Sequence, residues 1–269
     1  MVEYLKSPFN YTGTKFFELE ELFQYFPKGC DTIVDLFCGG GSVFINAGYK
    51  NVIANDIIKP LIYFYIALRD YDIEDILKCL EQVTISKDNQ EEFLRIRETF
   101  NQEGANDPFK FFSLCSSCTN NMMRFNKKFL FNQTFGKRSI NENTIQKLKE
   151  YSERIKAFDS IKFENKQYYE VEIPENSFVY LDPPYLITEA GYNCYWNKEL
   201  EEKLYEYVID LDKKGIKWGM SNMLSHKGIN NPFIDKILSF NVHKIESFKN
   251  KAAKQSKAEE STEVFITNF

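Results

Sequence analysis

Residues 31–56 read DTIVDLFCGGGSVFINAGYKNVIAND, and this stretch decides the fold. The apolar residues from Thr32 to Phe37 predict a buried strand, and the three glycines at 39–41 predict a tight turn. A helix is expected to begin at Ser42, and a second strand is expected from Asn51 to Asn55. Together these parts indicate a nucleotide-binding α/β unit.

This unit ends in Asp56, 17 residues after Gly39. An acidic residue at this distance can accept hydrogen bonds from both ribose hydroxyls of an adenosine-containing cofactor. Glycines in the turn let a ligand approach the backbone closely. The full G-x-G-x-x-G pattern is absent, so the unit alone also fits a nicotinamide-dependent oxidoreductase.

A second motif, Asp182-Pro183-Pro184-Tyr185, follows the apolar run from Phe178 to Leu181. Asp182 offers a carboxylate, and Pro183, with its fixed φ and no N–H, helps hold a rigid turn whose carbonyl is a second acceptor. The lone pair of a nucleobase amino group is delocalised into the ring, so methylation of that nitrogen needs acceptors for both N–H bonds to keep the lone pair localised. The two acceptors of this turn and the flat face of Tyr185, on which a base can stack, suit that reaction. The alternative is that the prolines only end a strand.

Taken together, the two motifs favour methyl transfer. An oxidoreductase has no need of an acidic di-proline turn, whereas an amino-methyltransferase needs both this turn and a pocket for S-adenosylmethionine. The chain resembles the Dam-like DNA adenine N6-methyltransferases, in particular the phage-type members. The matching stretches are PFNYTGTK (8–15), DLFCGGGSV (35–43), VIANDI (52–57), NNMMRFN (120–126), FGKRSIN (135–141), FVYLDPPYLIT (178–188), GMSN (219–222) and EVFITN (263–268).

The resemblance implies transfer of a methyl group from S-adenosylmethionine to N6 of an adenine flipped out of duplex DNA, with GATC as the leading target. It implies catalytic roles for Asp182, Pro183, Pro184 and Tyr185. The cofactor-binding residues would be Tyr11, Lys15, Asp35, Phe37, Gly39, Gly40, Asp56, Tyr168 and Asp182. The DNA-binding residues would be Asn121, Met122, Arg124, Asn126, Lys137 and Arg138.

Some of these positions also fit ordinary structural roles. Tyr168 could be a core residue, and Tyr11 and Lys15 could belong to a surface turn around Gly13. Arg124 could contact a phosphate without any role in sequence choice. Thr134 and the segment 127–130 depart from the pattern of the phage enzymes, which bears on the target sequence.

The distribution of charge matters more than the net charge of −5, which is unfavourable for a DNA-binding protein. Between Pro108 and Asn141 there is no acidic residue, while six lysines and arginines and several asparagines and phenylalanines occur there. This composition predicts a DNA-reading surface, and the alternative is a solvated loop whose phenylalanines pack inward. The stretch from Lys249 to Lys257 is either a phosphate-contacting loop or a solvated one.

Composition sets further limits. The first ten residues, MVEYLKSPFN, lack the apolar stretch of a signal peptide, and we expect a cytoplasmic protein with no membrane span. Six cysteines follow no disulfide framework. Cys115 and Cys118 have no second pair at zinc-finger spacing, so no metal is expected.

The predicted fold is α/β: a Rossmann-like, mostly parallel sheet of the S-adenosylmethionine-dependent methyltransferase type with an inserted helical DNA-recognition domain. Residues 1–61 and 148–269 would form the catalytic domain and residues 62–147 the recognition domain. Helices are expected at 14–26, at several places within 60–116, at 142–157 and at 198–213. Strands are expected at 160–163, 177–181, 215–221, 241–246 and 262–269.

Cofactor and base should meet at the carboxyl ends of the strands, where Gly39 and Asp182 would face one cleft. Double-stranded DNA is the expected partner, and protein partners are not predicted. Other functions stay open at this point: an amino-methyltransferase acting on cytosine N4 or on RNA, a non-catalytic DNA-binding regulator with the same fold, or the oxidoreductase.

Overall fold

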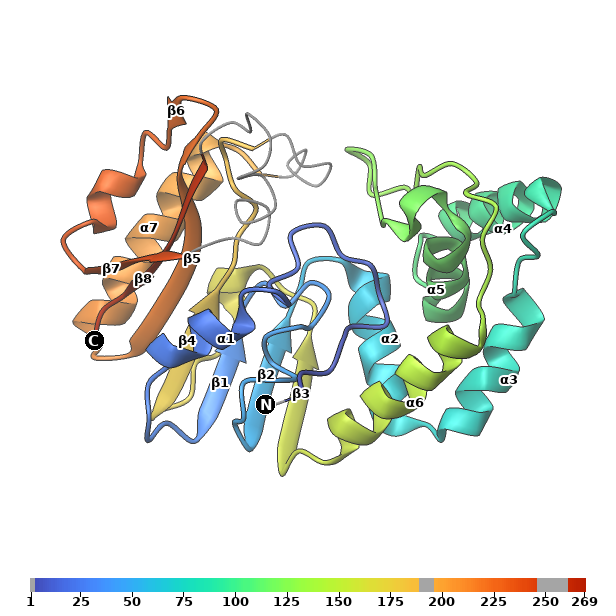
Figure 1. Cartoon of the computed structure of the whole chain (residues 1–269), viewed down its shortest axis with the longest axis horizontal. Coiled ribbons are helices and arrows are strands. Elements are labelled where there is room, and N and C mark those ends of the chain that lie inside the picture. The colour runs from blue at the N-terminus through green and yellow to red at the C-terminus, as the bar shows by residue number, and fades with distance from the viewer. Residues whose placement is uncertain (1–2, 189–195, 246–260) are drawn as a thin grey trace.

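The computed structural model describes residues 3–188, 196–245 and 261–269, and its centre is a single mixed sheet (Figure 1). The strands follow one another across the sheet as β3 (Ser160–Glu164), β2 (Asn51–Asn55), β1 (Thr32–Asp35), β4 (Ser177–Leu181), β5 (Lys217–His226), β8 (Ser261–Thr267) and β7 (Asn241–Ile245). The short β6 (Ile229–Asn230) pairs with β5 outside this row. Cys194 and the lysine-rich stretch 249–257 lie outside the described residues.

The five strands from β3 to β5 run parallel, whereas β8 is antiparallel to both of its neighbours. Strand β4 is buried at every position, as expected for a parallel strand that is covered on both faces. The prediction of an α/β fold with a mostly parallel sheet is confirmed.

The order of the strands reverses at β1. From β1 the chain moves outward through β2 to β3, and it then returns to form β4 on the other side of β1. Such a reversal opens a crevice at the carboxyl ends of the two strands on either side of it. Asp35 of β1 is in register with Tyr180 of β4, so Asp182 extends just beyond this edge of the sheet.

The long helices form two groups around the sheet (Figure 1). They are α2 (Lys59–Asp70), α3 (Ile73–Val83), α4 (Gln90–Gln102), α5 (Pro108–Ser117), α6 (Glu142–Lys156) and α7 (Lys198–Lys213). Shorter helical turns are α1 (Leu19–Leu22), η1 (Phe23–Tyr25), η2 (Thr119–Asn121), η3 (Tyr168–Glu170) and η5 (Ile234–Ile237). In Figure 1, α3, α4 and α5 gather to the right of the sheet and α7 lies on the left. The helices expected within 60–116, at 142–157 and at 198–213 are confirmed.

Two hydrophobic clusters form the core. The larger contains Ile33 and Phe178 of the sheet and continues through Phe64 of α2 and Phe111 of α5 into α3 and α4. The smaller lies on the α7 side of the sheet and includes Trp218. The helices α3 to α5 therefore share a core with the sheet, and the expected boundary at residue 62 falls inside α2.

The predicted helix beginning at Ser42 is wrong, because residues 42–47 form turns. The Asn46 side chain donates to the backbone carbonyls of Ser42 and Leu5, and Gly48 reverses the chain at a φ of +78°. These local hydrogen bonds compete with a helix, and only a few residues separate the glycine turn from β2. The first long helix after the glycine turn is α2.

The predicted helix over 14–26 is much shorter, since helical structure is confined to 19–25. Gly13 has a φ of +81°, and the Thr14 hydroxyl lies 2.8 Å from that of Ser42. Tertiary contacts of this kind override the helical spacing of the apolar residues. Strand β1 also ends earlier than expected, at Asp35, and β5 continues to His226.

No helix in the described ranges is long and apolar enough to cross a membrane.

Candidate active site

The acidic di-proline turn lies where the strand order reverses. Strand β4 ends at Leu181, and Asp182 follows it directly. On the neighbouring strand β1, Asp35 leads into the glycine turn at 39–41. The two motifs that are far apart in the sequence therefore stand beside each other at the carboxyl edge of the sheet, which the sequence predicted.

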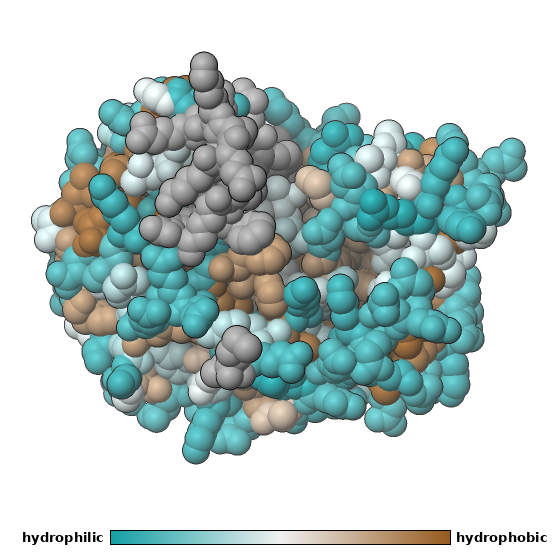
Figure 2. Space-filling view, viewed as in Figure 1, coloured by the Kyte–Doolittle hydropathy of each residue, from teal (hydrophilic) through white to brown (hydrophobic). Residues whose placement is uncertain are grey.

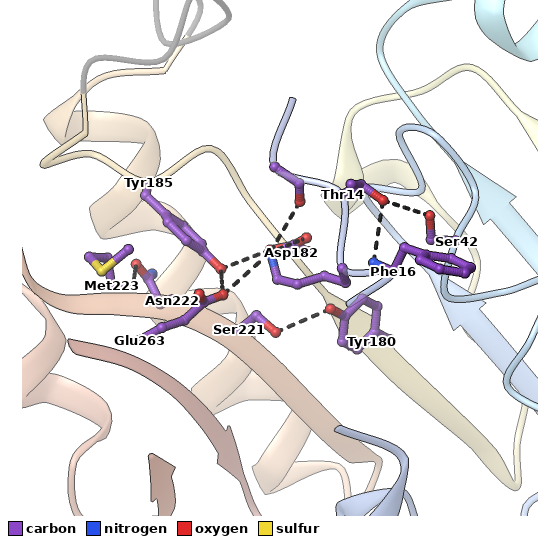
Figure 3. Close-up of polar contacts among 12 residues, drawn as sticks. Thr14, Phe16, Ser42, Tyr180, Asp182, Tyr185, Ser221, Asn222, Met223 and Glu263 are labelled. Carbon is purple, nitrogen blue, oxygen red and sulfur yellow. Dashed lines mark hydrogen bonds and ion pairs between the residues drawn. The ribbon is translucent and has the colours of Figure 1, made fainter. Parts of the chain in front are cut away.

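Four side chains meet at this turn, and Figure 3 labels three of them, Asp182, Tyr185 and Glu263. Lys15 Nζ lies 2.8 Å from Asp182 Oδ2 and 3.5 Å from Glu263 Oε1. The Tyr185 hydroxyl donates to Glu263 Oε1 at 2.8 Å and lies 3.1 Å from Asp182 Oδ1. Lys15 Nζ also lies 5.0 Å from the centre of the Tyr185 ring. We call Lys15, Asp182, Tyr185 and Glu263 the Asp182 cluster.

The other members of the Asp182 cluster influence the charge of Asp182. Burial raises the pKa of Asp182, the ammonium group of Lys15 lowers it, and the carboxylate of Glu263 raises it. Lys15 is itself only 7% exposed, so the attraction between Lys15 and Asp182 acts with little screening by solvent. Lys15 therefore favours the ionised form of Asp182, which is the form that accepts hydrogen bonds.

The glycine turn is held from several directions. Gly39 N–H donates to Asp56 Oδ2 at 2.9 Å, and Ile58 N–H donates to Asp56 Oδ1 at 2.9 Å. The Tyr65 hydroxyl, on α2, donates to the Gly39 carbonyl at 2.8 Å, and the Tyr151 hydroxyl, on α6, donates to the Gly41 carbonyl at 3.1 Å. These contacts fix the backbone of the turn in one conformation.

Tyr11 covers the glycine turn. A Cβ atom on Gly39 or Gly40 would come within 2.8 Å or 2.7 Å of Tyr11 atoms, so only glycine allows this approach. Thr14 adds a contact to Ser42 at the far side of the turn (Figure 3). The segment around Gly13 is thus packed against the cofactor motif and does not form an isolated surface turn.

Asp35 is the most unusual group in the site. It is 1% exposed, and neither carboxylate oxygen forms a hydrogen bond of normal geometry with a described residue. Burial raises the pKa of Asp35 well above its usual value, and the nearby carboxylates of Asp182 and Asp56 raise it further. Backbone N–H groups of Phe37 and Phe44 oppose this increase in the pKa. An uncompensated buried carboxylate is costly unless a positive partner is bound.

An aromatic group borders the site on the α7 side. The rings of Phe37 and Tyr168 lie 5.4 Å apart, and Trp196 lies 5.8 Å from Phe37 and 6.3 Å from Tyr168. Tyr168 is 3% exposed, and its hydroxyl has no hydrogen-bond partner in the described part of the chain. Tyr168 is therefore largely a core residue, and the half-buried Phe37 is the more accessible ring.

These features fit a cofactor that is cationic at one end and aromatic at the other. Asp35, Asp56 and Asp182 place three carboxylates around the glycine turn, and the two that border Asp35 raise its pKa. S-adenosylmethionine carries a sulfonium and an ammonium group, and these positive charges would relieve the repulsion among the three carboxylates. It also carries an adenosine, whose ribose needs hydrogen-bond acceptors and whose ring needs an apolar or aromatic face. Asp56 is a buried carboxylate beside the glycine turn, and Phe37 presents a half-buried aromatic ring.

The basic loop after α5 contains a hairpin. Asn126 N–H donates to the Leu130 carbonyl, and Asn132 N–H donates to the Arg124 carbonyl. Phe125 and Phe131 pair across the hairpin and are buried, whereas Phe129 at its tip is 40% exposed. Phe125 and Phe131 thus pack inward, as the alternative interpretation of this segment has it, whereas Phe129 does not.

The expected DNA-binding side chains lie on or near this hairpin. The Arg124 guanidinium is exposed and donates to the side chain and the backbone carbonyl of Asn132, at 3.0 Å in each case. Arg138 donates to Asn121 Oδ1 at 2.5 Å. Asn126 uses its side-chain oxygen inside the hairpin, where the N–H groups of Lys128 and Leu130 donate to it. Lys137 is exposed and Met122 is half-buried.

Metal ligands do not gather in the described ranges, since no group of three His, Cys, Asp or Glu side chains there could hold an ion. Cys115 and Cys118 are buried. The Cys118 thiol donates to the Met122 carbonyl at 3.2 Å, and burial raises the pKa of that thiol to about 12.

Sequence reasoning missed Tyr65, Tyr151 and Glu263. The two tyrosines lie on helices whose apolar spacing predicted only core positions. For Glu263 there was a signal: it is a lone acid in the otherwise apolar run EVFI of β8, and it is 9% exposed. A charged residue facing the core of a strand usually has a partner.

Comparisons with known proteins agree with this geometry. A family model described as D12 class N6 adenine-specific DNA methyltransferase matches residues 11–255. The chain is 32% identical to modification methylase StsI of Streptococcus sanguinis and 30% identical to type II methyltransferase M.FokI of Planomicrobium okeanokoites, over 99% of this chain and 43% of each relative. It is 28% identical to the DNA N-6-adenine-methyltransferase of Escherichia phage P1, over 82% of this chain and 30% of that protein. The chain thus spans less than half the length of these relatives.

Proposed function

Because the chain belongs to the D12 class N6 adenine-specific DNA methyltransferases, we propose that it transfers a methyl group from S-adenosylmethionine to N6 of an adenine in duplex DNA. The observation that carries this proposal is the position of Asp182, which follows β4 directly beside the glycine turn and the buried Asp35. This arrangement puts an amine acceptor next to a site suited to a cationic cofactor. The similarity to modification methylases supports a DNA substrate.

The cofactor site is built from the glycine turn and its neighbours. When bound, S-adenosylmethionine supplies a methyl group on a positively charged sulfur, which becomes a neutral thioether when the methyl group leaves. Asp35 is the partner for the positive charge of the cofactor, because it is buried without a hydrogen bond of normal geometry. Asp56 accepts the ribose hydroxyls, and Phe37, backed by the buried Tyr168, lines the adenine side. Tyr11 closes the site over Gly39 and Gly40.

Asp182 and the carbonyl of Pro183 activate the target nitrogen. They accept the two hydrogens of the adenine amino group and keep its lone pair directed at the methyl carbon. The lone pair forms the new N–C bond, and the surplus proton leaves through Asp182. Lys15 keeps Asp182 ionised until then. Because the acceptors are fixed in advance by the proline turn, orientation and electrostatic preorganisation contribute most of the rate.

The target base must leave the double helix to reach Asp182. An N6 atom in a paired stack cannot approach a buried methyl donor, so the adenine flips into the cleft. Tyr185 stacks on the flipped base. Its hydroxyl is fixed by Asp182 and Glu263, which orients the ring before the base arrives.

The helical region at 62–147 reads the DNA. It carries the hairpin with Arg124 and the exposed Lys137 and Arg138. An arginine fork matches O6 and N7 of guanine in the major groove. GATC is the recognition sequence that the resemblance favours, and Arg124 is the residue that reads a guanine in it.

The test is methylation of an unmethylated plasmid by the purified protein with S-adenosylmethionine. Methylated nucleosides are quantified by mass spectrometry, and the plasmid is digested with nucleases that cut unmethylated GATC. The proposal expects N6-methyladenine together with full protection. N6-methyladenine without protection would retain the chemistry and reject GATC, and sequencing of the modified sites would then give the true target.

The matched control is Asp182→Ala. This variant should lose methylation while it still binds S-adenosylhomocysteine, because Asp182 contacts the amine and the glycine turn holds the cofactor. N4-methylcytosine as the only product, or methylation of RNA alone, would contradict the proposed substrate. If the wild-type protein binds DNA and never methylates it, the proposed activity is rejected and the alternative of a non-catalytic DNA-binding regulator with this fold is favoured.

A further inference from the structure

A cavity of about 470 Å³ lies between the N-terminal segment, α5 and the start of α6. Its lining includes Lys6 and Ser7 from the N-terminal segment, and Thr144 and Lys147 from the first two turns of α6. It also includes Tyr11 and Thr14, which touch the glycine turn from the other side. The cavity is therefore next to the proposed active site, and its lining includes no member of the Asp182 cluster.

The charge of this cavity is one-sided. Its lining holds three cations, Lys6, Arg138 and Lys147, and no aspartate or glutamate. The whole chain is acidic, with a net charge of −5, so a cavity lining without any aspartate or glutamate differs from the average charge of the chain. The remaining polar lining residues are asparagine, serine, threonine, cysteine and tyrosine. Cations with hydroxyl and amide groups are the side chains that contact phosphate oxygens.

The two lysines are available to a ligand. Lys6 and Lys147 are exposed, and neither forms an ion pair with a carboxylate in the described part of the chain. Lys149, on the same helix as Lys147, differs in this respect because its ammonium lies 3.2 Å from Glu74 Oε1. Lys6 Nζ lies 5.4 Å from the centre of the Phe16 ring, which also lines the cavity, so its charge is held at the edge of this cavity.

The start of α6 strengthens the site. Asn141 caps this helix by accepting the N–H of Thr144 at 3.0 Å, and Asn141, Asn143 and Thr144 all line the cavity. The positive end of the helix dipole and the first-turn N–H groups favour an anion there. This contribution adds to the three cations, which are the primary observation.

We infer that this cavity holds a backbone phosphate of the DNA substrate. The inference rests on the proposed function, because it takes DNA as the partner, and it adds a contact that does not read sequence. A strand anchored beside Tyr11 would be held at the edge of the active site while the target base enters it. A phosphate contact of this kind fixes the position of the duplex.

The experiment measures DNA affinity as a function of salt for Lys147→Ala, Lys6→Ala and the double variant. Fluorescence anisotropy is recorded over about 50–200 mM NaCl with S-adenosylhomocysteine present, on one duplex with GATC and one without. Each lost phosphate contact should reduce the slope of log K against log salt by about 0.9 and weaken both duplexes equally. Lys149→Ala is the matched control and should keep the wild-type slope, and Lys147→Arg should keep it as well.

The results separate this inference from the proposed function. If the wild type methylates DNA and the double variant keeps the wild-type slope, the phosphate site is rejected and the function stands. If the double variant binds S-adenosylhomocysteine more weakly and DNA normally, the cavity serves the cofactor instead. If the wild type binds no duplex at all, both proposals fail. Melting temperatures close to that of the wild type exclude misfolding as the cause.

Discussion

Lys15 Nζ lies 2.8 Å from Asp182 Oδ2, so a residue of the N-terminal segment influences the charge of the acidic di-proline turn. The pair is mostly buried, and Glu263 stands on the other side of Lys15 at 3.5 Å. Besides Tyr185, whose hydrogen bond lowers the pKa of Asp182, the carboxyl faces Lys15, which lowers that pKa, and Glu263, which raises it. The two neighbours can be removed separately, and the expected effects have opposite signs.

Removing Lys15 should shift the acidic limb of the pH profile to higher pH. In the proposed mechanism Asp182 accepts the amine hydrogens in its ionised form, so activity should fall as the pH drops through its pKa. Burial has already raised this pKa, and Lys15→Met removes the group that lowers it. The measurement is kcat/KM for methyl transfer against pH, compared with the wild type. An unchanged limb would show that Lys15 does not control Asp182.

Glu263→Gln should shift the same limb to lower pH. The glutamine keeps the shape of the side chain and an acceptor for the Tyr185 hydroxyl, but it removes the negative charge that raises the pKa of Asp182. Glu103→Gln is a suitable control, because Glu103 pairs with Lys110 in the helical region. A shift to higher pH for Glu263→Gln would contradict the role given to its charge.

Much of the fold was predictable from local sequence. The strand at 51–55 and the strand at 177–181 have the predicted bounds, because each is an uninterrupted apolar stretch between turn residues. Helix α6 begins one residue after Asn141, which caps it as its sequence position suggests. In these places local preference and tertiary structure agree.

The failures occur where distant contacts decide the conformation. Residues 14–18 have a helical pattern, but Thr14 and Lys15 reach Ser42 and Asp182 instead. The same reason hides part of the site: Tyr65 donates to Gly39 from a helix whose pattern indicates only burial. Glu263 reaches Tyr185 from the last strand. Motifs in the sequence identify residues that could take part in the chemistry, but only the fold shows which of these residues lie in contact.

Gly41→Ala should destabilise the protein more than Gly48→Ala. The two glycines have nearly equal φ angles, +77° and +78°, so the backbone strain of an alanine is similar, roughly 1–2 kcal/mol. A Cβ on Gly41 would lie 2.0 Å from the Tyr151 hydroxyl, whereas nothing lies within 4 Å of a Cβ on Gly48. The clash should add roughly 1–3 kcal/mol to the loss in the free energy of unfolding. Denaturant titration measures both, and equal losses would contradict the packing of Tyr151 against the turn.

Asp35→Asn should stabilise the free protein and weaken cofactor binding. The pKa of Asp35 in the folded protein is raised above its unfolded value of about 3.9. Below about pH 3.9 the carboxyl is protonated in both states and does not reduce the free energy of unfolding. As the pH rises from there through the folded-state pKa, the free energy of unfolding falls. Asparagine removes this penalty, and the gain at neutral pH should be roughly 1–3 kcal/mol and should shrink towards pH 4. The exposed Asp31→Asn is the control. Isothermal titration calorimetry measures the affinity of the Asp35→Asn variant for S-adenosylmethionine. An affinity equal to that of the wild type would show that Asp35 does not contact the cofactor.

Arg124 tests whether the hairpin reads bases or only holds phosphates. Its exposed guanidinium donates to the side-chain oxygen and the backbone carbonyl of Asn132 at 3.0 Å, and these two hydrogen bonds orient it. If Arg124 reads a guanine, Arg124→Ala should reduce discrimination between the target and a single-base variant by roughly 1–3 kcal/mol. Arg124→Lys separates the two roles, because lysine keeps the charge and loses the planar fork.

For a base contact both variants should lose discrimination, and the lysine variant should keep the salt dependence of DNA binding. Weaker binding with unchanged discrimination in the alanine variant, restored by lysine, would make Arg124 a phosphate contact. Methylation rates on paired duplexes that differ at one base, measured together with anisotropy, distinguish these outcomes.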